Sequence, residues 1–115
     1  MQPIEECQKI ELSQGAIYLG NSDEKRSVGY LELNPHTSLT LHNRPAIEKL
    51  TQVKSKGQIV LYKNTQGEVI TLEEEQSFEI KPAGTWHIHT NPFETVSLTY
   101  WDFEGDITEI IENIR

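Results

Sequence analysis

The stretch Pro82-Ala83-Gly84-Thr85-Trp86-His87-Ile88-His89-Thr90-Asn91 decides the fold prediction for this 115-residue chain. Pro82 and Gly84 predict a tight turn, and apolar and polar residues alternate after it. Residues i and i+2 of a β-strand point to the same face, so we expect His87, His89 and Asn91 to share one. The earlier stretch His42-Asn43-Arg44-Pro45-Ala46-Ile47-Glu48 places His42 and Arg44 at the same spacing. If both faces look into one barrel, imidazoles, a carboxylate and a guanidinium converge in a pocket.

Short strand patterns separated by turn residues run through most of the chain. We expect strands at residues 16–19, 28–33, 38–42, 58–62, 69–72, 77–80, 86–89 and 95–103, with a further strand near 8–12. Residues 47–53 mix two periods and stay ambiguous. In the 38–42 strand, Leu39 and Leu41 would lie on one face, and Thr40 and His42 on the other. Many short strands at regular spacing predict a closed sandwich or barrel, with a jelly roll as one option.

The last ten residues follow a different pattern. Isoleucines at 107, 110, 111 and 114 form one stripe of an amphipathic helix, for which Asp106 is a suitable N-cap. A final edge strand is the alternative for 106–115, because the segment is short. No linker or internal repeat divides the chain, so we expect one domain over residues 1–115.

The charge and the cysteine content limit the partners and the compartment. Ten Lys and Arg against eighteen Asp and Glu give a net charge of −8, which repels phosphate backbones and anionic lipid, so we expect no nucleic acid or membrane partner. No apolar run approaches the length of a membrane span. The acidic N-terminus lacks the apolar region of a secretory signal, and Cys7 is the single cysteine, so we expect a cytoplasmic protein.

The two stretches resemble the two motifs of the cupin superfamily, and the chain is similar to its small single-domain members. Pro82, Gly84, His87 and Asn91 occupy the positions of the second motif, whose leading glycine is replaced by Gln76. The resemblance covers about residues 28–103. It implies an all-β fold with a single jelly-roll barrel. It also implies a homodimer, in which an N-terminal strand, here 8–12, joins the sheet of the partner.

The first motif is less complete. His42 and Glu48 match it, but His36 replaces its leading glycine and Arg44 replaces its second histidine. The resemblance implies a site for a divalent metal (Fe, Zn, Mn or Ni) at His42, Glu48 and His87. An arginine cannot ligate a cation. We expect His89 at the rim of the pocket, with a third ligand nitrogen as the alternative.

Each of these residues also has a simpler interpretation. His42 and His87 are either ligands or hydrogen-bonded histidines of a metal-free interior. Arg44 either pairs with Glu48 or binds an anion through its planar fork. Trp86 is either a core or interface aromatic or part of the pocket wall.

Arg44 favours a barrel that binds a small anionic molecule with weak or no metal, through Arg44, His42, His87 and Trp86. The alternative is a metal-dependent enzyme, an oxygenase or isomerase with two histidines and one carboxylate as ligands. A third hypothesis is catalysis without metal, with His42 or His87 as general base, which resembles the sugar-nucleotide epimerase cupins. The sequence does not decide between these functions.

Overall fold

The computed structural model describes residues 1–108, so the helix expected over 106–115 lies almost wholly outside the described residues. Asp106 nevertheless accepts hydrogen bonds at Oδ1 from the backbone and side chain of Thr108, at 3.0 and 2.6 Å, which is compatible with the predicted N-cap. No helix in this part of the chain is long and apolar enough to cross a membrane.

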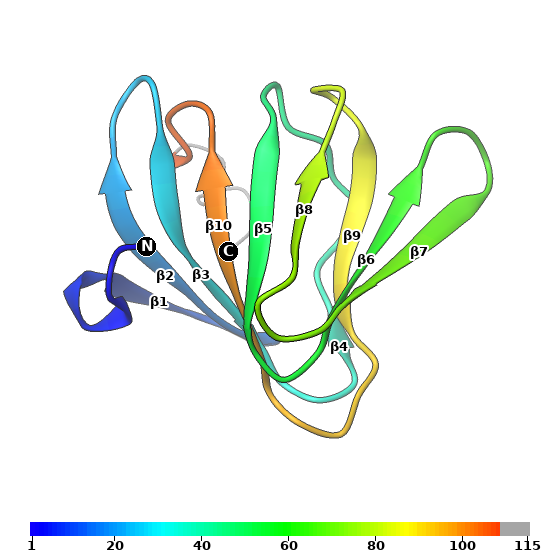
Figure 1. Cartoon of the computed structure of the whole chain (residues 1–115), viewed down its shortest axis with the longest axis horizontal. Coiled ribbons are helices and arrows are strands. Elements are labelled where there is room, and N and C mark those ends of the chain that lie inside the picture. Colours follow the sequence, from blue (N-terminus) through cyan, green and yellow to red (C-terminus); the bar gives the residue numbers. More distant parts are fainter. Residues whose placement is uncertain (109–115) are drawn as a thin grey trace.

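Two antiparallel sheets form the molecule (Figure 1). The larger sheet has the order β1 (Gln8–Leu12), β2 (Gly15–Ser22), β3 (Ser27–Leu33), β10 (Ser97–Phe103), β5 (Glu48–Lys54) and β8 (Ser77–Ile80). The smaller sheet has the order β4 (Thr37–Ser38), β9 (Trp86–Asn91), β6 (Gly57–Tyr62) and β7 (Gly67–Leu72). A short 3-10 helix, η1 (Ile4–Glu6), precedes β1. The all-β fold and the jelly-roll barrel expected from the sequence are confirmed.

Alternation along the strands fills the space between the sheets. In β6, Gly57, Ile59 and Leu61 are buried while the residues between them are partly exposed. Side chains of this kind from both sheets form the main core: Ile10, Ile17, Leu31, Leu33, Leu39, Leu50, Ile59, Leu61, Leu72, Ile80, Trp101, Phe103 and Ile107. Period-two alternation with one buried face is what an antiparallel sheet requires when it covers a core.

The N-terminal segment extends the larger sheet. β1 pairs with β2 of its own chain, with Ile10 opposite Ile17, so the barrel begins well before residue 28. A second apolar cluster on this sheet contains Val28, Tyr30 and Tyr100, with Ile4 of η1 packed against it. The other edge of β1 has no neighbouring strand among residues 1–108. The expected homodimer stays a prediction.

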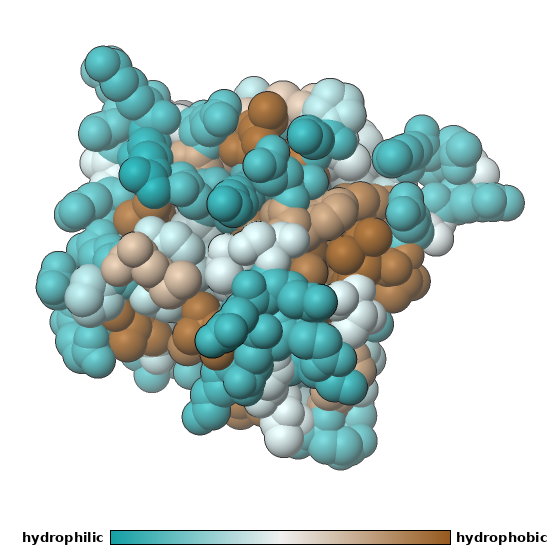
Figure 2. Space-filling model, viewed as in Figure 1, coloured by the Kyte–Doolittle hydropathy of each residue, from teal (hydrophilic) through white to brown (hydrophobic). Residues whose placement is uncertain are grey.

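Figure 2 shows hydrophilic side chains over most of one face of the molecule, with an apolar area over the region of β9 and β6. Large apolar residues with exposed side chains include Val69 of β7, Trp86 of β9 and Leu41 of the loop between β4 and β5. The surface is therefore mixed, and the polar residues that face inward are the ones that need an explanation.

The prediction of a strand at 38–42 is wrong beyond Ser38, where β4 ends. Ser38 pairs with Thr90, and the next bridge joins His42 to His87, so residues 39–41 lie opposite residues 88–89 only. This extra residue is a bulge, which reverses the alternation after it. Leu39 and His42 therefore both face the interior, whereas Leu41 is 50% exposed instead of sharing a face with Leu39.

Candidate metal centre

Three histidines converge at one end of the barrel. One ring nitrogen from each of His42, His87 and His89 lies within 4.8 Å of the others. The ring centroids of His42 and His87 are 4.3 Å apart, and those of His87 and His89 are 5.0 Å apart. Spacing of two along β9 places His87 and His89 on one face, as the sequence predicts, and both are buried. The expectation of His89 at the rim is wrong.

His42 reaches this cluster from the loop before β5. Its backbone nitrogen donates to the carbonyl oxygen of His87 at 3.0 Å, and the His87 nitrogen donates back at 2.8 Å. This single bridge fixes the backbone of His42 beside β9. Because the bulge turns the side chain inward, the ring of His42 lies edge-on to the ring of His87.

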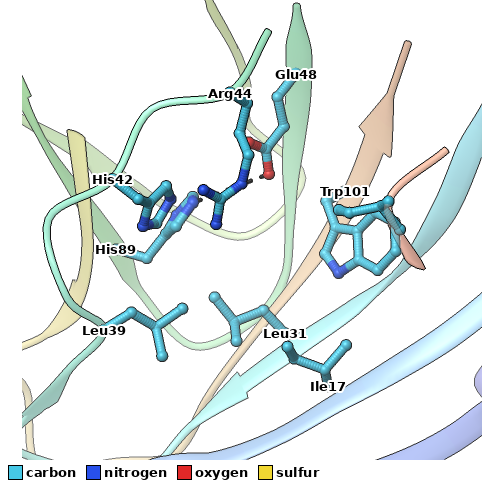
Figure 3. Close-up of a pocket in the computed structure, with 9 residues that line it drawn as sticks. Ile17, Leu31, Leu39, His42, Arg44, Glu48, His89 and Trp101 are labelled. Carbon is cyan, nitrogen blue, oxygen red and sulfur yellow. Dashed lines mark ion pairs between the residues drawn. The ribbon is translucent and has the colours of Figure 1, made fainter. Parts of the chain in front are cut away.

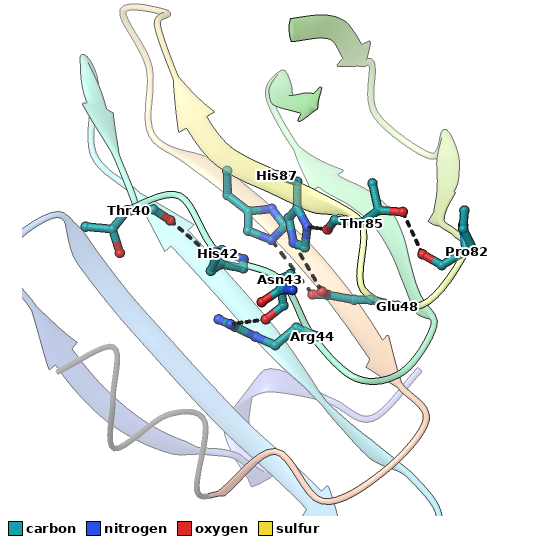
Figure 4. A network of polar contacts seen from close by, with 9 residues as sticks. Thr40, His42, Asn43, Arg44, Glu48, Pro82, Thr85 and His87 are labelled. Carbon is teal, nitrogen blue, oxygen red and sulfur yellow. Dashed lines mark hydrogen bonds and ion pairs between the residues drawn. The ribbon is translucent and has the colours of Figure 1, made fainter. Parts of the chain in front are cut away.

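Two backbone carbonyls set the tautomers of these rings (Figure 4). Nδ1 of His42 is 2.8 Å from the Thr40 oxygen, and Nδ1 of His87 is 2.8 Å from the Thr85 oxygen. A carbonyl only accepts, so each Nδ1 carries the proton and each Nε2 of a neutral ring keeps a free lone pair. Metal-ligating histidines are oriented in this way.

The Nε2 atom of His87 is a buried nitrogen with no hydrogen-bond partner among the described residues. Such an atom costs free energy unless a ligand or ion satisfies it. Glu48 at the start of β5 approaches but does not satisfy it, because its Oε2 lies 3.7 Å away. The Oε1 atom of Glu48 lies 3.9 Å from Nε2 of His89. These separations leave a gap between the carboxylate and the two imidazoles.

The rings of His42 and His89 are held in the neutral form that metal binding needs. Burial lowers the pKa of His42 to about 3, with His87 and Arg44 adding to the effect. Burial also brings the pKa of His89 well below its ordinary value, again with His87 contributing. Neutral imidazoles and one carboxylate are a donor set that suits zinc, iron and manganese. The residues therefore fit a divalent metal, with His89 in addition to the three residues that the motifs supplied.

Arg44 lies beside this donor set without entering an ion pair with Glu48. Its Nη1 donates to the Asn43 oxygen at 2.9 Å. Its backbone oxygen accepts a hydrogen bond from Gly84 at 2.7 Å, so the turn before β9 holds the Arg44 segment in place. Burial lowers the pKa of Arg44, and the charge of Glu48 opposes that effect. The fork pairing of Arg44 with Glu48, one of the two interpretations of the sequence, is not found, and the guanidinium makes a single hydrogen bond among residues 1–108.

A cavity of about 30 Å³ lies next to these groups. Its polar side is formed by four residues: His42, Arg44, Glu48 and His89 (Figure 3). Its apolar side consists of Ile17, Leu31, Leu39, Trp101 and Ile107. The four polar residues come from β9, β5 and the loop between β4 and β5, whereas the apolar residues come largely from the larger sheet.

The structure does not bring Trp86 to this pocket. Trp86 precedes His87 in β9, so it faces outward, and its side chain is 48% exposed. Trp101 of β10 forms the aromatic wall instead. Its alternation with Phe103 indicates an inward side chain, but the sequence does not indicate that it lies near the histidines. His36 also lies apart from the site, where its Nε2 is 2.9 Å from Glu94.

Comparison with known proteins finds structural likeness at low sequence identity. No family model matches the chain, and no curated protein matches its sequence. The Drosophila melanogaster CENP-C cumin domain superposes with a TM-score of 0.74 at 16% identity, over 85% of this chain and 72% of that one. Oxalate decarboxylase from Bacillus subtilis, a protein with Mn(II) centres, gives a TM-score of 0.77 at 15% identity, over 90% of this chain and 29% of its own.

Vicilin from tomato, Solanum lycopersicum, gives a TM-score of 0.73 at 16% identity, over 91% of this chain and 32% of its own. The chain thus spans less than a third of the length of vicilin and oxalate decarboxylase. Since identities are this low and the proteins so different, the likeness establishes the fold and not the activity.

Proposed function

The chain has the cupin fold, and on that premise we propose that it binds a divalent metal ion and a small anion in one pocket. His42, His87, His89 and Glu48 would hold the ion, and Arg44 beside them would bind the anion. The presence of Mn(II) centres in a protein of the same fold supports the choice of metal class. Iron, zinc, manganese and nickel are the candidate metals.

The buried Nε2 atom of His87 is the observation that carries this proposal. Its ring is fixed by the Thr85 carbonyl, and its lone pair points toward Glu48 across a gap that neither group closes. A structural histidine in a finished core would find a hydrogen-bond partner, because buried polar atoms seldom go without one. Four donors around one gap are better explained as a ligand set.

When bound, a divalent ion would supply Lewis acidity toward the anion. The chain's own residues would do the rest. Arg44 would orient the anion with its planar donors, and the Thr40 and Thr85 carbonyls would keep the rings of His42 and His87 in place. The buried walls would exclude water. An oxygenase or isomerase of a small acid could be built on this arrangement.

Binding of an anion without metal is the second candidate function. It is favoured by Arg44, whose positive charge opposes a second cation nearby. Its support is weaker, because the guanidinium accounts for the anion but leaves Nε2 of His87 without a partner.

Metal content separates the two functions. Purified protein should be dialysed against Zn²⁺, Mn²⁺, Fe²⁺ or Ni²⁺ and analysed by elemental mass spectrometry. We expect one ion per chain in the wild type and metal binding more than about 100-fold weaker in His87→Ala. Removal of a residue that only hydrogen-bonds a ligand already lowers metal affinity by about 10–100-fold, and removal of the ligand itself should lower it further.

His36→Ala is the matched control, because this histidine is exposed and outside the pocket. It should bind metal as the wild type does. A wild type that binds none of the four metals more tightly than His87→Ala would contradict the metal site. Anion binding that persists in that protein and disappears in Arg44→Gln would support the second function.

A further inference from the structure

We propose that the anion of this pocket is a short monocarboxylate with an apolar body, and not a dicarboxylate or an inorganic oxyanion. The inference rests on the proposed function, because it assigns the ligand of that same pocket. It follows from the division of the pocket walls, from the unused donors of Arg44 and from the size of the cavity.

The cavity has one charged side and one hydrocarbon side. Leu39, Leu31 and Ile17 lie across from the guanidinium of Arg44, and Trp101 flanks them (Figure 3). These apolar side chains are all nearly inaccessible from outside, with 7% or less of their surface exposed. We call Ile17, Leu31, Leu39 and Trp101 the apolar floor. A molecule held at Arg44 has to place the remainder of its atoms against this floor.

Arg44 can receive a carboxylate at little cost to its existing bonds. A guanidinium has five N–H donors, and among residues 1–108 that of Arg44 makes one hydrogen bond, to the Asn43 oxygen. A carboxylate matches two of the free donors in a fork geometry. The polar end of the ligand is therefore satisfied by one residue, next to the histidines.

Without metal, a second negative group would find no second cationic side chain in this cavity. Arg44 is the single lysine or arginine among the described residues that line it. A second carboxylate would lie against the apolar floor or toward Glu48, which is acidic. Burial of an unpaired charge is strongly unfavourable, and sulfate or phosphate would likewise present oxygens to hydrocarbon. The walls thus discriminate against dianions.

The volume sets the size of the acid. A cavity of about 30 Å³ has room for about two water molecules. So small a space limits the acid to a short one, with isobutyrate at the upper end of the range, and longer chains would require the floor to move.

The test is a calorimetric titration of the Zn²⁺-loaded and metal-free full chain with acetate, propionate, isobutyrate, malonate, sulfate and isobutyramide. We expect affinity to rise about fourfold for each carbon added between acetate and isobutyrate, because each buries one methyl or methylene group. Malonate carries a second charge, and isobutyramide has the shape of isobutyrate without charge. In the metal-free protein both should bind at least about tenfold more weakly than isobutyrate.

Leu39→Ala and Leu41→Ala form a matched pair for the floor. Leu39 is buried in the cavity wall, whereas Leu41, two residues later, is exposed. Leu39→Ala should move the preference to longer acids such as valerate, and Leu41→Ala should leave the order of affinities unchanged. If Leu39→Ala does not fold, Ile17→Val removes one methyl group from the same floor and should weaken isobutyrate about fourfold.

Malonate or sulfate binding to the metal-free protein as tightly as isobutyrate would overturn the inference, as would equal effects of the two leucine variants or no binding of any acid. Zn²⁺ affinity is measured in the same samples, so that the two proposals can fail separately. Zn²⁺ binding together with a preference of the metal-free protein for malonate refutes the ligand class alone. Absence of Zn²⁺ binding with the isobutyrate preference intact refutes the metal site and supports the ligand class.

Discussion

Two buried polar clusters face the interior of this barrel, and both begin on the inner face of β5. Gln52 is 1% exposed; it donates to the Lys54 oxygen at 2.9 Å and the Ser97 hydroxyl at 3.0 Å, and it accepts from the Thr99 hydroxyl at 2.7 Å. Glu48, four residues earlier, approaches two histidines only to 3.7 and 3.9 Å. The polar atoms of the Gln52 cluster hydrogen-bond to one another, whereas the cluster of Glu48 and the histidines leaves Nε2 of His87 without a hydrogen-bond partner among the described residues. Burial of polar groups alone therefore does not distinguish the proposed site in this protein; convergent polar atoms without partners do.

The largest effect should come from replacing a member of each cluster by leucine. Gln52→Leu leaves Ser97, Thr99 and the Lys54 oxygen without partners, so we expect a loss of about 2–4 kcal/mol in the free energy of unfolding, with metal affinity unchanged. His89→Leu removes an imidazole that makes no hydrogen bond among residues 1–108. We expect the metal-free protein to keep or gain stability while it loses metal affinity.

Urea unfolding and Zn²⁺ titration of both variants measure these opposite responses. A metal-free His89→Leu protein that is destabilised as much as Gln52→Leu would show that the histidine cluster is structural, and the distinction between the two clusters would fail.

Acid should destabilise the protein through the histidine cluster. The pKa of His42 falls from an ordinary value near 6.5 to about 3 in the folded chain, so the unfolded chain binds the proton more tightly. Stability of the metal-free protein is therefore lost as the pH falls below 6.5, by about 1 kcal/mol per pH unit for each such histidine, until the folded pKa is reached. His89, whose pKa is also lowered, should add to this slope.

Unfolding curves between pH 7.5 and pH 5 provide the measurement (~2.5 pH units, chosen to span the ordinary histidine pKa). His89→Leu should flatten the dependence, and Gln52→Leu, which carries no titratable group, should leave it unchanged. A slope that does not respond to His89→Leu would assign the acid sensitivity to other groups.

The smallest effect concerns the charge next to the proposed metal ligands. Arg44→Gln removes a cation that repels a divalent ion, so metal affinity should rise by about threefold to tenfold. Affinity for isobutyrate should fall in the same variant. Zn²⁺ and isobutyrate titrations of Arg44→Gln test this opposition, and a parallel loss of both affinities would mean that Arg44 supports the histidine cluster structurally.

The sequence is sufficient to predict what depends on local spacing. The turn at Pro82 and Gly84, the strand after it and the shared face of His87 and His89 follow from residue order alone, and the structure confirms them. The motif pattern also identifies His42 and Glu48, and both reach the pocket.

What the sequence could not give depends on neighbours far along the chain. Trp101 lines the pocket because Gly29 lies across from it in β3; a Cβ atom at Gly29 would come within 2.4 Å of the indole ring. No local pattern connects these two residues. The burial of His89 likewise follows from the packing of the two sheets, which the alternation along β9 does not specify.

The extra residue between Ser38 and His42 has a consequence for how such a pocket is kept or lost along a lineage. Deletion of Thr40 would leave equal numbers of residues on the two paired segments, and residue 42 would still lie opposite His87 on the inner face. Loss of a second residue from this segment would shift residue 42 by one position and turn its imidazole toward solvent. In this barrel, one codon can be lost at that point without harm to the donor set, whereas a two-codon deletion would dismantle it without any substitution.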